Sequence, residues 1–249
     1  MTHLLRAISF LTILPLSRGE DAGEMDLGAL SPAVGFFPLV GILLGGILLL
    51  FDLALSSLVP PPALDALILI LLVFLTGGLH LDGLADTVDG LSGGSTREER
   101  LRLMKDSRLG ALGAAALVLA LLAKYGALRG LSPGMRGWGI LLFPALSRWS
   151  MSLLCWRSTY ARAEGGTGRA FTEGVRGKDF LLATVFCLPL SLVGLGLMRA
   201  IFILVALAAG ALLFESFTRR RLGGSTGDTY GAANEGGEIL ALLAMGFYQ

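Results

Sequence analysis

Three aspartates at helical spacing carry the clearest chemical potential in this sequence. Asp82, Asp86 and Asp89 lie in the segment 77–90, GGLHLDGLADTVDG. Their i, i+4, i+7 spacing puts all three carboxylates on one face of a helix, where like charges repel one another. The stripe directly follows an uncharged apolar run, and repulsion is stronger where the dielectric is low. Oxygen-only ligands favour Mg²⁺ or Mn²⁺ over zinc, so these aspartates are candidate catalytic residues and ligands of Mg²⁺, whose shell substrate phosphates would complete.

A second acidic motif lies near the end of the chain, in the segment 227–235, GDTYGAANE. Asp228 and Glu235 are again seven residues apart, and they are candidate ligands that would complete the first metal site or hold a second ion. Thr229 and Asn234 between them are candidate substrate-binding residues. The segment looks like residues 85–90, ADTVDG, which either marks a weak internal repeat or is chance similarity.

Other polar residues close to these motifs have two interpretations each. His80 is either a general base beside the metal or a packed, hydrogen-bonded histidine. Arg148, inside an apolar run, either pairs with a carboxylate or holds a substrate phosphate, whereas Lys124 and Glu215 are expected to form structural ion pairs. The segment 104–110, MKDSRLG, offers candidate phosphate-binding residues, which also serve as anchors at a membrane surface: Lys105, Asp106, Ser107 and Arg108.

The composition indicates what must position these residues. Of 249 residues, 54% are hydrophobic and 16% are charged, against about 25% charged in a typical soluble domain, and the mean hydropathy is +0.73. This excludes an ordinary cytosolic enzyme and a disordered chain, and a net charge of +1 provides no basic surface for nucleic acid. The sequence predicts one all-α domain over residues 1–249, a polytopic membrane bundle. Its 35 glycines permit close helix packing within or between chains, as in a homo-oligomer.

Six apolar runs are candidate membrane spans, since a span needs about 20 mostly apolar residues. A short helix is expected at the start, where an apolar stretch over residues 7–16 has no cleavage signal after it and suits an interfacial or re-entrant helix. The last apolar stretch, 239–249, is too short to span unless its helix begins earlier. The six runs are 27–51, 66–81, 109–128, 137–156, 180–198 and 200–217.

The basic residues predict how the spans are oriented. If the six runs cross in turn, fourteen of the twenty Lys and Arg residues fall on one side, three on the other and three within segments. The positive-inside rule assigns the fourteen to the cytoplasm. Residues 82–108, 157–178 and 218–237, which include both acidic motifs, are therefore expected to face the cytosol.

Four segments together resemble one known family. Residues 77–90 are similar to the signature of the cobalamin synthases, the adenosylcobinamide-GDP ribazoletransferases, which are integral-membrane enzymes of late vitamin B12 assembly. Residues 104–110 resemble the next block of that family, and residues 227–232 with Glu235 resemble its C-terminal block. Residues 10–15, FLTILP, resemble the family's opening, which often has Arg where Ile13 stands.

The resemblance implies a reaction and a location. Adenosylcobinamide-GDP and α-ribazole, or its 5′-phosphate, would give adenosylcobalamin, or its 5′-phosphate, and GMP, with Mg²⁺, at the bacterial or archaeal inner membrane. A ribose hydroxyl would attack the corrinoid-side phosphorus, which requires in-line positioning and charge neutralisation. Lys105 and Arg108 would then clamp the GMP phosphate, and a carboxylate or His80 would take the hydroxyl proton.

Three alternatives remain at this point. The membrane phosphotransferases of the CDP-alcohol type share the start of the motif, DGLA at residues 82–85, but have Arg where Asp86 stands and a longer gap to their last two aspartates. An ion-coupled transporter would place its acids near the middle of a span, whereas most of these lie at one predicted face. A structural scaffold leaves the stacked carboxylates unexplained. Mg²⁺-dependent release of GMP from a GDP-linked substrate distinguishes the first interpretation from the transporter and the scaffold.

Overall fold

The protein is a bundle of helices. The computed structural model describes residues 2–14 and 31–247. Across these residues it has no strand, and its only β-type pairing is an isolated bridge between Tyr160 and Ser225, which confirms the all-α class. The helices are α1 (Thr2–Leu11), the 3-10 helix η1 (Ser31–Phe36), α3 (Phe37–Leu55), α4 (Pro61–Thr76), α5 (Leu79–Gly93), α6 (Arg97–Leu103), α7 (Ala111–Arg129), α8 (Pro133–Arg157), α9 (Thr167–Ala170), α10 (Gly177–Leu195), α11 (Leu197–Leu222) and α12 (Gly227–Gly246).

Among the residues that the structure describes, five helices are long and apolar enough to cross a membrane: η1 with α3, α7, α8, α10 and α11. A sixth crossing results if α4 and α5, which meet at an angle of 88°, count as one broken span. The expected number of about six is therefore confirmed. The outer faces agree with this assignment, because large apolar side chains such as Leu50, Phe74 and Val193 are mostly exposed, as lipid-facing residues are.

The ends of the helices differ from the predicted runs in several places. The first run begins at residue 27, but residues 27–30 lie outside the described part of the chain. Arg18, residues 15–16 of the first apolar stretch and residues 248–249 of the last one also lie outside it. The run 66–81 is interrupted, because Gly77 and Gly78 have φ of +60° and +71° and end α4 before α5 begins. Only glycine adopts such angles without steric cost, so the paired glycines produce the bend.

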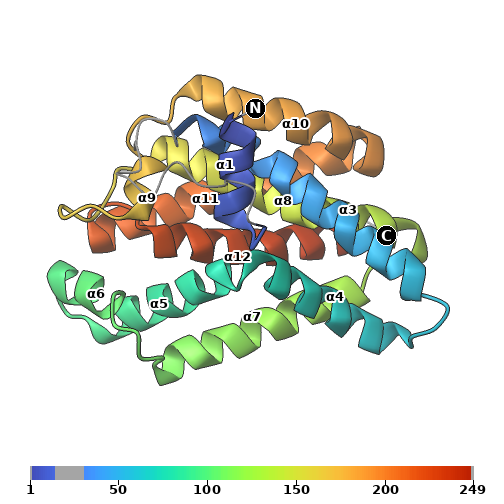
Figure 1. Cartoon of the computed structure of the whole chain (residues 1–249), viewed down its shortest axis with the longest axis horizontal. Helices are drawn as coiled ribbons and strands as arrows, with labels where there is room; N and C mark the ends of the chain where they lie inside the picture. Colours follow the sequence, from blue (N-terminus) through green and yellow to red (C-terminus); the bar gives the residue numbers. More distant parts are fainter. Residues whose placement is uncertain (1, 15–30, 248–249) are drawn as a thin grey trace.

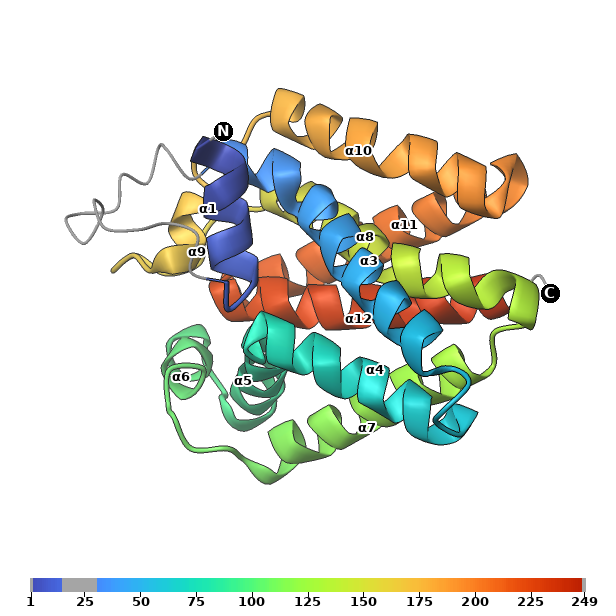
Figure 2. The same ribbon diagram turned by 45° about the vertical axis from the view of Figure 1, so that its right-hand side comes forward.

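Two helices form the centre of the bundle. In α8, 89% of the residues in the apolar stretch are buried, against 22–50% in the other four spanning helices. The second central helix, α12, begins at Gly227 and not near Ile239, and it packs against α5, α8, α11 and α7. Figures 1 and 2 show α12 running through the middle of the molecule with α5 and α4 along one side. Most of the last acidic motif is thus helical and enclosed.

The polar loops gather at one end of the bundle. Figure 1 places α5, α6 and α9 at this end, and the turn between α3 and α4 at the opposite end. Contacts between the loops agree: Arg97 donates to the carbonyl of Ala161 at 2.8 Å, and Arg100 donates to the carbonyl of Arg221 at 3.2 Å. The loops predicted to share one face of the membrane therefore lie together.

An ion cluster ties the opposite end together. Arg136, at the start of α8, donates to Asp52 of α3 at 2.7 Å and to Asp65 of α4 at 2.6 Å. Both carboxylates are buried. One guanidinium therefore joins three helices at the end of the bundle away from the acidic motifs.

Candidate active site

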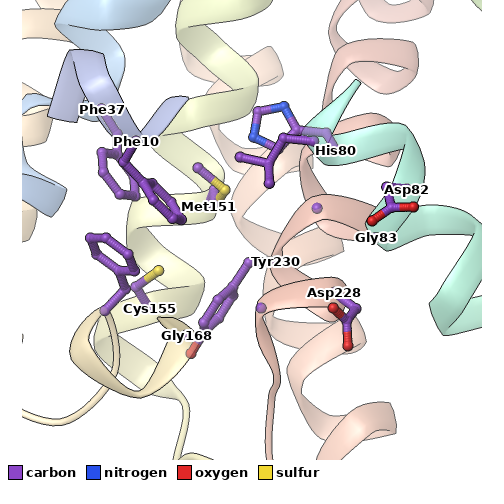
Figure 3. Close-up of a pocket in the computed structure, with 14 residues that line it drawn as sticks. Phe10, Phe37, His80, Asp82, Gly83, Met151, Cys155, Gly168, Asp228 and Tyr230 are labelled. Carbon is purple, nitrogen blue, oxygen red and sulfur yellow. The ribbon is translucent and has the colours of Figure 1, made fainter. Parts of the chain in front are cut away.

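The two acidic motifs meet where α5 crosses α12. A Cβ added at Gly83 would lie 2.7 Å from the carbonyl oxygen of Asp228, and one added at Gly231 would lie 3.1 Å from that of His80. The backbones therefore touch at glycines, which side chains would prevent. Figure 3 shows Asp82 and Asp228 on the two helices at this crossing.

The carboxylates at the crossing act on one another. Burial, with the charges of Asp82 and Asp228, raises the pKa of the Asp86 carboxyl to about 6. Burial also raises the pKa of the Asp228 carboxyl, against the opposing effect of Arg162. Asp86 lies on α5, which is too short and polar to span alone, and Asp228 lies in the first turn of α12. Repelling carboxylates of this kind are stabilised by a cation.

Asp89 has a different environment from the other two aspartates of the stripe. Its carboxylate accepts the backbone N–H groups of Gly110 and Gly113, both at 2.7 Å. These groups belong to the first turn of α7, whose N-cap residue, Gly110, has no side chain to cap the helix. Asp89 therefore provides from α5 the oxygens that a capping residue normally provides.

Within the described residues, no three His, Cys, Asp or Glu side chains are placed so as to hold a metal ion by themselves. The predicted five-residue ligand set is therefore not assembled as one cage. Asp82, Asp86 and Asp228 still offer only oxygen donors, and Mg²⁺ is usually bound by one or two carboxylates with substrate phosphates completing its shell. The donor set at the crossing fits a magnesium ion of this kind.

Arg162 is a site residue that the sequence analysis did not single out. Its Nη2 donates to Oδ2 of Asp228 at 2.7 Å, and its Nε is buried without a partner. The loop that carries it is attached to the start of α12 by the bridge between Tyr160 and Ser225. The sequence marked Arg162 only as one of fourteen loop cations, and no local motif distinguished it.

Glu235 lies in a separate buried network, away from the acidic crossing. It pairs with Lys124 of α7 at 2.7 Å, and Lys124 also binds Glu238. Arg148 of α8 donates to Glu238 at 3.3 Å and is fully buried. Of the two interpretations of Arg148, the structure thus contains the pairing with a carboxylate, and Lys124 forms the structural pair that was expected.

His80 and Asn234 belong to the same network. Asn234 Nδ2 lies 3.0 Å from His80 Nδ1 and 3.1 Å from Glu238 Oε1. Thr229 is also buried, and its hydroxyl accepts the backbone N–H of Thr226 at 2.8 Å in the capping box of α12. Thr229 therefore fixes the helical turn that presents Asp228.

The α6–α7 loop lies at the rim of the site. Lys105 pairs with Glu164 at 2.9 Å, and Arg108 pairs with Asp106 at 2.6 Å. The Arg108 guanidinium lowers the pKa of the Asp106 carboxyl to about 2. Both cations are largely exposed, and exposed pairs contribute little to stability, so a phosphate can displace the carboxylates from them.

Two hollow spaces adjoin at Asp82. An open groove of about 620 Å³ is lined by Asp82, Asp86 and Ser107, with the glycine bend between α4 and α5. An enclosed cavity of about 90 Å³ extends from Asp82 into the bundle. Phe10, Leu79 and Asp82 line both spaces. Figure 3 shows the cavity between the aromatic side chains of Phe10, Phe37 and Tyr230 and the helix that bears His80 and Asp82.

The fold and this site define a class: a polytopic helical membrane protein with a carboxylate site beside a groove at one end of its bundle. The chain belongs to the cobalamin-5-phosphate synthase family, whose family model matches residues 3–246.

Curated relatives match over nearly their whole length. An adenosylcobinamide-GDP ribazoletransferase of Syntrophobacter fumaroxidans is 42% identical over 248 residues, which cover 98% of this chain and 97% of the relative. Proteins of the same name from Geotalea daltonii and Escherichia coli K12 are 39% and 37% identical over 245 and 242 residues. These matches cover 96% of this chain in both cases, and 94% and 96% of the two relatives. No solved structure matches the chain.

Proposed function

We propose that this protein transfers the adenosylcobinamide phosphate group from adenosylcobinamide-GDP to α-ribazole or its 5′-phosphate, with release of GMP. The observation that carries the proposal is the crossing of α5 and α12, which puts Asp82 and Asp86 beside Asp228. The groove that Asp82 and Asp86 line is large enough for a diphosphate. The names of the relatives supply the substrate class, and the site supplies chemistry that suits it.

Mg²⁺ would be held by Asp86 and Asp228, since it usually takes one or two carboxylates from a protein, and when bound it would neutralise charge on the diphosphate oxygens. Arg162 pairs with Asp228, and its buried Nε, which has no partner, suits a phosphate oxygen. Lys105 and Arg108 at the rim would hold the phosphate that leaves with GMP. Asp89 would keep α5 in register with α7, because both of its oxygens bind α7.

The transfer exchanges one phosphorus–oxygen bond for another. A ribose hydroxyl of the acceptor forms a bond to the corrinoid-side phosphorus, and the bond from that phosphorus to the bridging oxygen of GMP breaks. The hydroxyl proton passes to a carboxylate, for which we assign Asp82, because it lines both the cavity and the groove. The bridging oxygen leaves as part of the GMP phosphate.

The test uses purified protein in nanodiscs with adenosylcobinamide-GDP, α-ribazole 5′-phosphate and Mg²⁺. We expect GMP and the corrinoid product in equal amounts, and no formation of either after addition of a chelator. Absence of both products from folded protein that binds Mg²⁺ contradicts the proposal, and a screen of CDP-alcohol donors then tests the related class.

We also propose that the end of the bundle with the acidic motifs faces the cytoplasm, since most loop cations lie there. A reporter fused at Ala163 that is active only outside the cytoplasm contradicts this orientation.

A further inference from the structure

The side chain of His80 is held at one nitrogen and free at the other. Its Nδ1 lies 3.0 Å from Asn234 Nδ2. Its Nε2 is buried without a partner, and the residue is 4% exposed. The ring lines the enclosed cavity, and Figure 3 shows it projecting from α5 toward Met151.

The network around Asn234 determines where the imidazole proton is. Asn234 Nδ2 also donates to Glu238 Oε1 at 3.1 Å. Glu238 forms salt bridges with Lys124 and Arg148 and therefore carries a negative charge. If the side-chain amide of Asn234 were flipped, its oxygen would face the Glu238 carboxylate, and two acceptors would repel each other. The NH₂ group of Asn234 must therefore face both Glu238 and His80. A nitrogen that accepts a hydrogen bond carries no proton. The ring is therefore neutral, with its proton on Nε2.

An N–H group buried without an acceptor is costly, about 1–3 kcal/mol, and rare in native proteins. The acceptor for Nε2–H must come from what enters the cavity. Aromatic and sulfur-bearing side chains form most of the cavity wall, among them Phe37, Phe171, Tyr230 and Met151, and no Lys or Arg is among the described residues that line it. Asp82 and Asp228 at its edge repel anions. This wall favours a flat, neutral ring over a phosphate.

We propose that the cavity receives the aromatic base of the acceptor nucleoside and that His80 donates Nε2–H to the unprotonated ring nitrogen of that base. The inference rests on the proposed function. Asn234 and Glu238 are positioning residues, because they keep the proton on Nε2. This role also removes His80 as the general base, since Nε2 has no lone pair to offer.

The cavity must widen to admit a two-ring base. Its volume of about 90 Å³ is below the roughly 150 Å³ of a cavity that binds benzene. Phe10 lines both the cavity and the groove and is only partly buried. A base that enters from the groove would pass Phe10, whose ring would have to turn away from Phe171.

The proton position can be measured without catalysis. The chain has two histidines, so ¹⁵N-histidine labelling with a His3→Gln background leaves only His80 visible by NMR in nanodiscs. We expect a proton on Nε2 and none on Nδ1, and loss of this preference in Asn234→Leu. A proton on Nδ1 in the His3→Gln protein overturns the inference.

Ligand titrations on the same sample identify the acceptor atom. α-Ribazole without a 5′-phosphate should shift the Nε2–H signal, whereas inorganic phosphate, and the analogue with C–H in place of the free ring nitrogen, should not. A shift with inorganic phosphate alone overturns the assignment to the base. An equal shift with the C–H analogue overturns the hydrogen bond.

Kinetics then separate this inference from the proposed function. The protein should prefer α-ribazole over the C–H analogue by about tenfold in kcat/KM, as expected for one hydrogen bond. His80→Leu should abolish the preference, and His80→Gln, which keeps an N–H near the position of Nε2, should retain part of it. Turnover of both acceptors with no preference overturns the inference alone. Turnover of neither contradicts the proposed function, while the NMR result remains interpretable.

Discussion

Arg162 Nη2 lies 2.7 Å from Asp228 Oδ2, although the two residues come from different elements of the chain. The bridge between Tyr160 and Ser225 holds the loop of Arg162 against the start of α12. The guanidinium thus pairs with one carboxylate of the acidic cluster and keeps a buried Nε without a partner. A cation so placed offsets carboxylate repulsion in the free protein and offers a donor to an incoming phosphate.

Replacing Arg162 should affect turnover more than stability. We expect Arg162→Gln to lower kcat/KM by about 10–100-fold, which corresponds to one charge-assisted hydrogen bond, with Arg162→Lys retaining part of the activity. The matched control is Arg169→Gln, because Arg169 forms an exposed pair with Glu173. Equal activity of the Arg162 and Arg169 variants in the GMP-release assay contradicts the role of Arg162.

Composition and periodicity were sufficient to predict the class of fold. A charge-poor chain of this length must hide its apolar surface in lipid, and the positions of breakers and basic residues then fix the approximate spans and their shared ends. The position of α12 was not predictable in this way. Its first half is polar enough to suggest a loop, but Asn234 meets His80 of α5 and Glu235 pairs with Lys124 of α7.

The site was predictable only in part for the same reason. The spacing of Asp82 and Asp86 indicates a shared face, and Asp228 lies beside them, which is one of the two placements that the sequence left open. Periodicity does not show what faces a helix, however. The carboxylate of Asp89 meets the start of α7, and Glu235 meets a lysine, because the neighbouring helices supply those partners from distant parts of the sequence.

The different environments predict different effects of substituting the three aspartates. Asp82→Asn and Asp86→Asn should each reduce turnover by more than 100-fold, the first through loss of the proton acceptor and the second through loss of charge stabilisation. Asp86→Asn should also weaken Mg²⁺ binding. Asp89→Asn should instead lower the free energy of unfolding by about 1–2 kcal/mol, as for loss of a helix cap.

Calorimetric Mg²⁺ titration and denaturant unfolding of each variant provide the measurements. The Kd for Mg²⁺ of Asp89→Asn should remain close to that of the unchanged protein. If Asp89→Asn loses Mg²⁺ binding as fully as Asp86→Asn does, Asp89 is a ligand and not a cap.

The glycine crossing should be sensitive to a single methyl group. Gly83→Ala places Cβ 2.7 Å from the carbonyl oxygen of Asp228, so α5 and α12 must separate and the carboxylates lose their geometry. We expect a large loss of activity, with a loss of stability of about 1–3 kcal/mol from overpacking. Gly236→Ala in α12 is the control, since nothing lies within 4 Å of its added Cβ. Comparable loss in both variants would show that the crossing has no special role.

The far end of the bundle offers a test of stability without a change in chemistry. Arg136→Met removes the cation shared by Asp52 and Asp65, and breaking a buried pair in this way costs about 3–5 kcal/mol. Because Arg136 is far from the groove, activity of the remaining folded protein should be retained. A variant with unchanged Tm in detergent contradicts the structural role of this cluster.

Lys124 provides the most demanding test of the buried network. It is 2% exposed and faces both Glu235 and Glu238, so Lys124→Met leaves one carboxylate wholly unpaired and should cost about 3–5 kcal/mol. The double variant Lys124→Met/Glu235→Leu removes that orphaned charge, while Arg148 still neutralises Glu238. We therefore expect the double variant to be more stable than Lys124→Met alone in reversible unfolding by detergent mixtures. A double variant that is no more stable than Lys124→Met would show that Lys124 and Glu235 are not coupled. That result would contradict the buried network that holds Asn234 and His80 in place.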